Sequence, residues 1–274
     1  MGAQSGAGLD FCAHTKRKGG QLSVTHNGKT YELVMFDLDD TLAPSKTAMS
    51  DEMVELFREL LAGSLGCIIS GGQYGQFQSQ VLDRLGDFPD RANLHLMPTN
   101  GTRYVRWSED WETVYAEDLS DDQKARAMRV VEEGARELGL WESETWGPIL
   151  EDRGSQITFS ALGQSAPVDA KSAWDPDGRK KESLRAYAAD RLPDLEVRSG
   201  GSTSVDITAK GIDKAYGARR LMEILNLTTD DILFFGDRLD EGGNDRPVAE
   251  LGIESIAVHG WEDTYAKLGA IVRA

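Results

Sequence analysis

Three separate apolar runs in the sequence each stop at a polar or acidic residue. They are residues 31–36 before Asp37, residues 65–69 before Ser70, and residues 231–235 before Gly236 and Asp237. Short apolar runs bounded by turn residues predict buried strands. A helical pattern that begins at Ser50 separates the first two runs, and a strand, helix, strand order forms a right-handed parallel crossover. Because ligands bind at the carboxyl ends of parallel strands, we expect an α/β, Rossmann-like parallel sheet with a site at that edge.

The composition and the hydrophobic pattern of the sequence change between residues 100 and 195. Five of the six tryptophans fall there, and Ser120 to Gln123 form a capping-box start for a helix. Residues 156–162 alternate between polar and apolar, as in a half-buried strand. This mixture predicts an inserted α+β domain. We therefore expect a flexible tail over 1–28, a core formed by 29–95 and 198–274, and an insert over 96–197.

Composition restricts the partners of the chain. With 46 acidic and 30 basic residues the net charge is −16, which disfavours nucleic acid and anionic membrane surfaces as partners. An anionic substrate would need a local basic cluster. Two cysteines, Cys12 and Cys67, are too few for a disulfide framework, and no apolar stretch reaches the ~20 residues of a membrane helix. With no signal-peptide core at the N-terminus, we expect a cytoplasmic protein.

The segment after the first run carries the residue types that phosphoryl transfer requires. Such an enzyme needs a nucleophile, an acid/base, a divalent cation and donors to the phosphate oxygens. Asp37 can attack phosphorus, Asp39 can protonate the leaving oxygen and later activate water, and Thr41 can form a hydrogen bond within the loop. The alternative is an acidic surface turn. Its position after a fully apolar strand favours the catalytic interpretation.

The other strand ends complete the catalytic set. Ser70 can donate to phosphate oxygens, Lys214 can supply a counter-charge, and Asp237 with Asn244 and Asp245 can bind a metal ion. A calcium loop over residues 237–245 is the rival, but it lacks the required acidic spacing and the terminal glutamate. The four histidines are scattered and predict no zinc site.

This ordered set resembles the four motifs of the haloacid dehalogenase-like (HAD) superfamily, over most of the chain beyond residue 30. The resemblance implies an aspartyl-phosphate on Asp37. It also implies Mg²⁺ bound by the Asp37 carboxylate, the backbone carbonyl of Asp39 and, directly or through water, Asp237. Asn244 and Asp245 resemble the second half of the acidic motif, which positions waters or Lys214.

The place and content of the insert are similar to one branch of that superfamily. An insert between Ser70 and Lys214 looks like the C2 cap of type IIB, and its details resemble the phosphomannomutase group. The matching stretches are 100–101, 151–153, 199–206, 211–214 and 236–245. The resemblance implies a small phosphorylated sugar as substrate and a possible homodimer through the cap. The implied substrate-binding residues are Gly71 beside Ser70, and Arg153, Ser204 and Asp206.

Three departures from the phosphomannomutase pattern concern residues that bind phosphate. Lys46, Gln164 and Lys171 stand where that pattern has arginines. Arginine binds phosphate through a planar fork, lysine is a point charge and glutamine is neutral. Losing one fork weakens anchoring by about 1.5–3 kcal/mol, which favours escape of a bisphosphate intermediate and attack by water. We therefore expect a sugar-phosphate phosphatase, with a phosphohexomutase as the alternative.

Two further alternatives stay open at this point. Arg153 can form an ordinary surface salt bridge with Glu151 or Asp152 instead of binding substrate. A non-catalytic sugar-phosphate sensor on the same fold is a remote possibility, although such proteins usually lack the nucleophile or the acid/base. Both Asp37 and Asp39 are present here.

Overall fold

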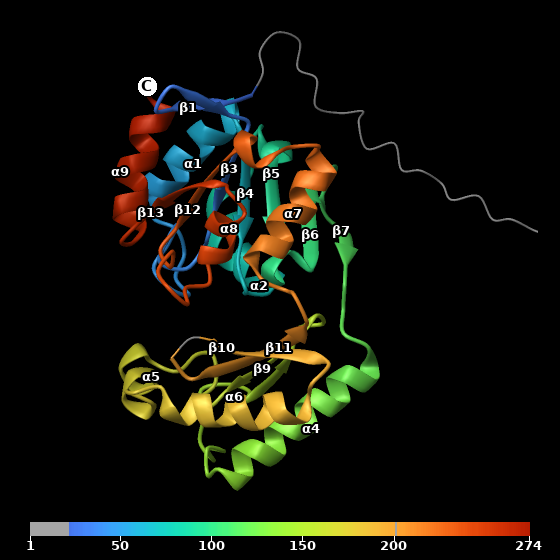
Figure 1. Ribbon diagram of the computed structural model, residues 1–274. Helices are drawn as coiled ribbons and strands as arrows, with labels where there is room; N and C mark the ends of the chain where they lie inside the picture. The colour runs from blue at the N-terminus through green and yellow to red at the C-terminus, as the bar shows by residue number, and fades with distance from the viewer. Residues whose placement is uncertain (1–21, 201) are drawn as a thin grey trace, which may run out of the picture.

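The computed structural model describes residues 22–200 and 202–274, so Cys12 and His14 lie outside the described residues. Figure 1 shows two domains, one built on a seven-stranded sheet and the other on a four-stranded sheet. We call them the core and the cap. The chain crosses between them twice, after strand β7 and after strand β11.

The core sheet is parallel in its centre and antiparallel at one side. Its order is β13 (Glu254–Ala257), β12 (Ile232–Gly236), β3 (Leu33–Phe36), β4 (Leu65–Ile69), β5 (Leu94–Met97), β6 (Arg103–Trp107) and β7 (Trp111–Ala116). Strands β13 to β5 are parallel, and β6 and β7 extend the sheet as an antiparallel hairpin. Every residue of β3 and β12 is buried, as expected for strands covered on both faces.

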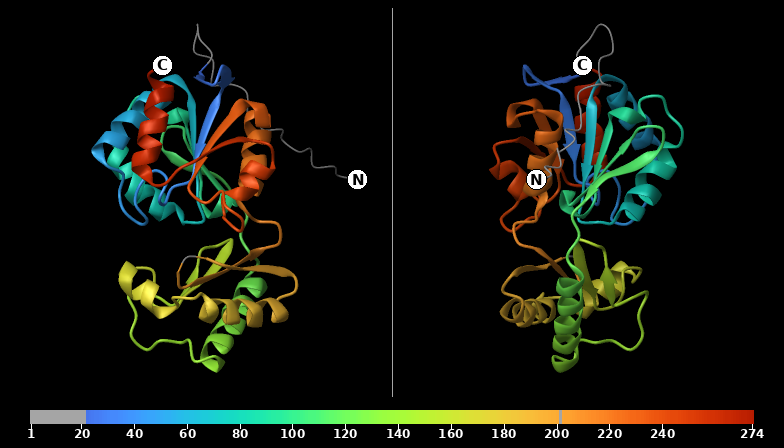
Figure 2. Two further views of the ribbon diagram at one scale, coloured as in Figure 1. Left: turned by 60° about the vertical axis from the view of Figure 1, so that its left-hand side comes forward. Right: turned by 90° about the vertical axis from the view of Figure 1, so that its right-hand side faces the viewer.

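Helices cover both faces of this sheet (Figure 2). One face packs against α1 (Asp51–Gly63), α9 (Trp261–Val272) and the segment α2 (Tyr74–Phe77), η1 (Gln78–Leu82) and α3 (Asp83–Leu85), where η1 is a π-helical turn. The other packs against α7 (Lys214–Leu225) and α8 (Arg246–Glu250). Phe36 contacts Phe57 edge-on at 5.5 Å and stacks on Phe235 at 5.2 Å between ring centroids. Short 3₁₀ turns lie at η2 (Arg91–Asn93), η3 (Thr99–Gly101) and η4 (Thr229–Asp231).

The expected tail over 1–28 is wrong for its last residues. Strand β1 (Val24–His26) pairs with β2 (Lys29–Tyr31), and Val24 is buried. Asn27 and Gly28 form the two-residue turn with φ of 51° and 78°. Both values lie in the left-handed region that such hairpin turns require, so the Asn-Gly pair was a hairpin signal. Residues 1–21 lie outside the described residues.

The cap is an antiparallel sheet with helices on one face. The order is β10 (Leu195–Ser199), β11 (Ser204–Ala209), β9 (Gln156–Ser160) and β8 (Leu150–Asp152), with α4 (Asp121–Glu137), α5 (Val168–Trp174) and α6 (Arg179–Arg191). Ile157, Phe159, Val205 and Ile207 pack against α4 and α6. Because side chains alternate across a strand, the polar residues of β9 and β11 occupy the opposite face, which is turned toward the core (Figure 1).

Sheet pairing corrects the domain boundaries expected from the sequence. Strands β6 and β7, expected in the insert, belong to the core sheet, where Leu96 is paired with Val105. Strand β11, expected in the core, pairs with β9 and β10 of the cap. The change of composition near residue 100 marks a hairpin that continues the core sheet. Trp107 and Trp111, which are paired across this hairpin, pack on each other. Among the described residues, no helix has the length and apolar character needed to cross a membrane.

Candidate active site

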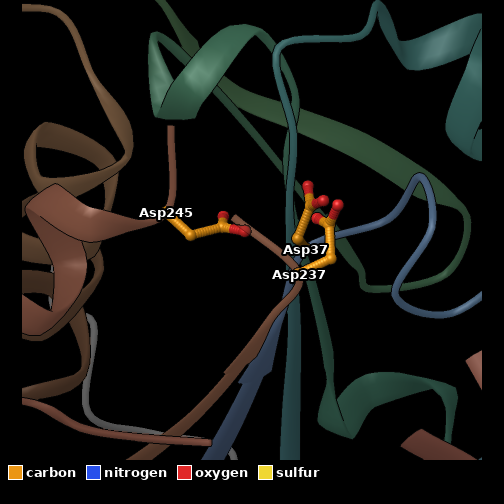
Figure 3. A group of neighbouring side chains, drawn as sticks. All are labelled: Asp37, Asp237 and Asp245. Carbon is orange, nitrogen blue, oxygen red and sulfur yellow. The ribbon is translucent and has the colours of Figure 1, made fainter. Parts of the chain in front are cut away.

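Three carboxylates meet at the carboxyl end of the core sheet. Asp37 follows β3, Asp237 follows the neighbouring strand β12, and Asp245 precedes α8. Each offers one oxygen, and these oxygens lie within 4.8 Å of one another (Figure 3). Asp37 is 4 % exposed and Asp245 is fully buried. Parallel pairing of β3 with β12 thus brings together two acids that are 200 residues apart in the sequence.

Lys214 joins two of these carboxylates. Its Nζ lies 2.6 Å from Asp37 Oδ1 and 2.5 Å from Asp245 Oδ1, and its side chain is 1 % exposed. Lys214 is the first residue of α7, where the side chain of Asp213 caps the helix by accepting from Tyr216 N at 2.8 Å. The cap fixes the start of the helix, and with it the direction of the lysine.

The three carboxylates can carry more negative charge than the single ammonium of Lys214 neutralises. Burial raises the pKa of Asp37, and the ammonium of Lys214 opposes that rise while Asp245 adds to it. Burial and Asp245 likewise raise the pKa of Asp237. Lys214 keeps a raised pKa because its two carboxylates outweigh its own desolvation. Lys214 forms salt bridges with two of the three clustered carboxylates, and a bound divalent cation would reduce the excess negative charge.

The donor set fits a hard divalent cation. Oxygen atoms from carboxylates and backbone carbonyls are the ligands that Mg²⁺ takes in proteins, and the cluster contains only carboxylates. Asn244, the other residue expected to bind metal, is exposed, whereas Asp245 next to it is buried against Lys214. Asp245 therefore holds the lysine, as one of the two roles expected for it.

Asp39 lies in a separate set of contacts. Its carboxylate accepts from Lys46 N at 2.8 Å, Lys46 Nζ at 2.6 Å and Gln76 Nε2 at 2.9 Å. Burial raises the pKa of Asp39, but Lys46 and the hydrogen bonds lower it by more, so the net shift is downward. An ionised Asp39 can take a proton from an attacking hydroxyl or water.

Two glutamines of this site were not found from the sequence. Gln76 binds both Asp39 and Lys46, accepting from Lys46 Nζ at 2.8 Å. Gln80 Nε2 donates to Thr47 O at 2.6 Å and lies 3.4 Å from Asp39 Oδ1. The two are four residues apart on a segment with a π-helical turn, a feature common at functional sites. Their spacing was the available signal, but it is also that of any solvated helix face.

The expected hydrogen bond of Thr41 within the loop is absent. The Thr41 hydroxyl is buried and has no partner among the described residues. Backbone bonds close the loop instead, from Leu42 N to Leu38 O at 3.0 Å and from Asp40 N to Ala43 O at 2.7 Å. Asp40 adopts a left-handed φ of 60°, which gives the sharp turn after Asp39.

Ser70 and Gly71 lie at the carboxyl end of β4, beside Asp37 at the end of β3. Ser70 is 5 % exposed, and its hydroxyl oxygen accepts from Gly72 N at 3.2 Å. The hydroxyl proton stays available for an acceptor such as a phosphate oxygen. A side chain on Gly71 would approach the amide of Asn100 at 3.8 Å.

The polar face of the cap sheet is centred on Asp206. Its Oδ1 accepts from Gln156 Nε2 at 2.9 Å and Thr158 Oγ1 at 2.8 Å. Burial raises the pKa of Asp206, and the charges of Arg153 and Lys46 oppose that rise. Lys46 belongs to the core, so charged residues of both domains act on Asp206.

The remaining predicted cap residues form a chain of contacts on the same face. Ser204 Oγ lies 3.3 Å from Ser160 Oγ, Gln164 Nε2 donates to Ser160 Oγ at 2.5 Å, and Lys171 Nζ donates to Gln164 O at 2.7 Å. Burial lowers the pKa of Lys171, and the charge of Lys46 lowers it further. Two lysines from different domains thus repel each other, which an anion between them would relieve.

Arg153 makes the local salt bridge that the sequence left open. Its guanidinium donates to Glu151 Oε2 at 2.6 and 3.2 Å, and its side chain is 11 % exposed. The pair is not an ordinary surface one, because Arg153 is mostly buried and acts on the pKa of Asp206. The structure thus brings Asp37, Lys214, Asp237 and Asp245 into one cluster and Arg153, Asp206, Ser204, Gln164 and Lys171 onto one face of the cap.

Comparisons with known proteins found a matching family model and related sequences. A family model of haloacid dehalogenase-like hydrolases matches residues 170–247. The chain is 24% identical over 243 residues to a phosphomannomutase of Encephalitozoon cuniculi, covering 86% of this chain and 91% of that one. It is 27% identical over 224 residues to a phosphomannomutase of Saccharomyces cerevisiae, covering 79% and 84%.

Solved structures share the fold. A haloacid dehalogenase-like hydrolase from Bacteroides thetaiotaomicron superposes with a TM-score of 0.58 at 17% identity, covering 88% of this chain and 99% of that one. An N-terminally truncated IMP-nucleotidase of Plasmodium falciparum gives 0.65 at 16% identity, covering 88% and 70%. The comparisons favour the mutase alternative over the phosphatase expected from the sequence. The chain is a phosphoryl-transfer enzyme of phosphatase or phosphomutase type, and it resembles the haloacid dehalogenase-like hydrolases and, among its relatives, the phosphomannomutases.

Proposed function

We propose that the protein is a phosphohexomutase, which moves a phosphoryl group between positions 1 and 6 of a hexose phosphate. The observation that carries the proposal is the placement of two sites. A buried aspartate paired with Lys214 lies at the edge of the core sheet, and the polar face of the cap sheet is turned toward that edge. The phosphomannomutases that the chain matches support the same reaction class.

In this proposal Asp37 is the nucleophile. Ionised Asp39 first takes the proton from the sugar hydroxyl whose oxygen attacks the phosphorus of an aspartyl-phosphate on Asp37, and the bond from Asp37 to phosphorus breaks. In the second half, the freed Asp37 carboxylate attacks the other phosphate of the bisphosphate, the sugar oxygen leaves, and Asp39 returns the proton to that oxygen. Lys214 holds the Asp37 carboxylate in place at 2.6 Å. Ser70 Oγ and the amide of Gly71 donate to the phosphate oxygens.

Asp37, Asp237 and the backbone carbonyl of Asp39 would hold Mg²⁺, with Asn244 reaching it through water. When bound, the ion neutralises the negative charge of the phosphoryl group and of the carboxylates. The proposal expects that removing divalent ions with a chelator abolishes turnover and that adding Mg²⁺ restores it.

The cap would bind the sugar and its distal phosphate. Asp206 can accept from two sugar hydroxyls through its remaining lone pairs, with Ser204 beside it on the same strand. Arg153, Lys171 and Lys46 provide positive charge for the distal phosphate, and Gln164 provides amide donors. A homodimer through the cap is also part of the proposal.

A sugar-phosphate phosphatase is the second candidate. The observation in its favour concerns the residues proposed to bind the distal phosphate. Lysine or glutamine stands in place of an arginine at Lys46, Gln164 and Lys171. Lys46 is moreover occupied by Asp39 and Gln76. A weaker grip lets the intermediate leave, and water then attacks the aspartyl-phosphate.

One experiment separates the two candidates. The protein is incubated with Mg²⁺ and glucose 1-phosphate or mannose 1-phosphate, with and without hexose 1,6-bisphosphate, and free phosphate and hexose 6-phosphate are measured separately. Isomerisation that exceeds phosphate release supports the mutase. Stoichiometric phosphate release without isomer establishes the phosphatase, and no turnover of either sugar contradicts both.

A further inference from the structure

The turn η3 (Thr99–Gly101) at the end of β5 has an unusual backbone. Thr99, Asn100 and Gly101 have φ angles of 49°, 56° and 83°, all in the left-handed region. This region suits glycine, but it is unfavourable for a β-branched residue such as Thr99. Such strain persists only where the surrounding contacts hold the backbone in place, and it is often found at functional sites.

On one side this turn holds the phosphate-binding loop proposed above. Thr99 N donates to Gly72 O and Asn100 N donates to Ser70 O, both at 2.9 Å. Two backbone hydrogen bonds therefore tie the turn to the residues on either side of Gly71. A change in the turn moves the loop that donates to the phosphate.

On a second side the turn contacts helix α7. A Cβ on Gly101 would lie 2.3 Å from Gly217 Cα, and a Cβ on Gly217 would lie 2.7 Å from Asn100 O. Only a pair of glycines allows this approach. Because α7 begins with Lys214, the turn also fixes the helix that carries the partner of Asp37.

On a third side a buried hydroxyl cluster links the turn to the cap. Thr102 Oγ1 lies 2.6 Å from Ser155 Oγ, 2.7 Å from Thr99 Oγ1 and 2.9 Å from Thr99 O. Thr99, Thr102 and Ser155 are 3 %, 2 % and 4 % exposed. The Thr102 hydroxyl has one proton and two lone pairs. Thr99 O can only accept, so Thr102 satisfies all three neighbours when it donates to this carbonyl and accepts from the hydroxyls of Thr99 and Ser155.

The position of Thr102 makes this link a joint between the domains. Its carbonyl accepts from Glu117 N at 2.8 Å, at the first crossing from the core to the cap. Ser155 follows the turn of Arg153 and Gly154, and Gly154 O accepts from Leu119 N at 3.1 Å on the same crossing. The hydroxyl contact therefore joins the crossing, the cap residue Arg153 and the strained turn.

We infer that the Thr102–Ser155 contact is a positioning contact that couples the cap to the phosphate-binding loop and to Lys214. When the Arg153 turn moves with bound substrate, the joint transmits that movement to the turn η3, which lies against both catalytic elements. The inference rests on the proposed roles of Arg153 and Ser70. Thr102 and Ser155 touch no reacting group, so they act only through these neighbours.

The first test needs no substrate. Hydrogen–deuterium exchange is measured on the full chain for Ser155→Ala, with the exposed cap residue Ser183→Ala as a matched control. The inference predicts about fivefold faster exchange at the core amides of Thr99 and Asn100, which corresponds to about 1 kcal/mol, the value of one hydrogen bond. Faster exchange confined to the cap, or no change, overturns the coupling.

The second test separates positioning from general stability. Thr102→Val, Ser155→Ala and the double variant are assayed with glucose 1-phosphate and with p-nitrophenyl phosphate, which lacks the sugar hydroxyls and the second phosphate. We expect kcat to fall about fivefold for the sugar phosphate and to stay within about twofold for the aryl phosphate. Thr102→Ser, which keeps the hydroxyl, should retain wild-type kcat, as should the exposed control Thr113→Val.

The double variant should be no worse than either single variant, because both remove the same contact. Equal losses on the two probes, additive losses or failure of Thr102→Ser to retain activity would overturn the inference. If wild-type protein does not turn over sugar phosphates, the proposed function fails. The exchange measurement then still decides whether the joint couples the domains.

Discussion

The core and the cap present functional side chains in two different ways. In the core, Asp37, Ser70 and Asp237 each stand directly after a buried parallel strand. Because the carboxyl ends of parallel strands lie at one edge of the sheet, the three residues come together there. In the cap, Thr158 and Asp206 lie on one face of antiparallel strands, and cross-strand pairing brings them together. In the proposed function, the chemistry therefore depends on residues at strand ends, and the choice of substrate depends on the strand pairing of the cap sheet.

The largest effect is expected in the core. Asp37→Asn removes the proposed nucleophile but keeps the shape of the side chain, so kcat should fall on the order of a thousandfold or more. The loss should be the same for glucose 1-phosphate and p-nitrophenyl phosphate, since both use the same attacking oxygen. Steady-state assays of both substrates measure this. Activity within tenfold of wild type would place the chemistry elsewhere.

In the cap, a substitution should distinguish the two substrates. Arg153→Met removes a guanidinium that is 11 % exposed, and we expect kcat/KM for the sugar phosphate to fall roughly thirtyfold, within the range for a hydrogen bond to a charged group. The rate with p-nitrophenyl phosphate should change little. Arg179→Met, on an exposed cap helix residue, is the matched control. Equal losses on both substrates would contradict the proposal that the core carries the chemistry and the cap binds the sugar phosphate.

Acid should remove a contribution that His95 makes to the stability of the core, and the cap has no histidine. All four histidines lie outside residues 117–213, and burial lowers the pKa of His95 to about 4. Its ring accepts or donates at Nδ1 with Tyr104 at 2.7 Å. At this residue the unfolded chain binds a proton near pH 6.5 while the folded core does not, so the contribution of His95 to stability falls as the pH drops from about 6.5 toward 4.

The effect of His95 can be measured as a difference between variants. Going from pH 7 to pH 5.5 should cost about 1.2 kcal/mol through this residue. His95→Asn keeps a polar group near Tyr104 and should remove that part of the pH dependence in chemical unfolding monitored at core residues. The exposed His259→Asn is the control. The same pH dependence in wild type and His95→Asn would refute the assignment.

The smallest effect concerns the fate of the phosphoryl group. Gln164→Arg with Lys171→Arg adds guanidinium forks at two cap positions that have none. We expect the ratio of isomer to free phosphate to rise about fivefold, since each added fork strengthens the grip on the distal phosphate. Product analysis with hexose 1,6-bisphosphate present measures the ratio. A lower ratio would show that the existing lysine and glutamine are the better anchors.

The catalytic part of the site could be predicted from the sequence because it depends on local patterns. Apolar runs ending in Asp37, Ser70 and Asp237 define strand ends, and Asp213 before Lys214 gives a helix start that the structure has. The α/β class followed from the same runs. The assignment of roles to these residues stays a prediction until variants are assayed.

The parts that could not be predicted depend on contacts between distant segments. The hairpin β6–β7 extends the core sheet because it pairs with β5, and nothing in its own alternation distinguishes this from pairing in the cap. Gln76 contacts Asp39 and Lys46, which lie 37 and 30 residues earlier in the sequence, so its own segment gives no sign of these partners. The fate of the phosphoryl group was predicted from single substitutions, whereas the relatives that the chain matches favour the mutase.

The most direct test of the account is to locate the phosphoryl group. Wild-type protein is mixed with Mg²⁺ and hexose 1,6-bisphosphate, quenched in acid within milliseconds and digested, and the phosphorylated peptide is identified by mass spectrometry. The account predicts phosphate on Asp37, its loss in Asp37→Asn, and transfer to hexose 1-phosphate in a chase faster than release to water. Phosphate on another residue, or no phosphorylated enzyme during active turnover, would contradict it.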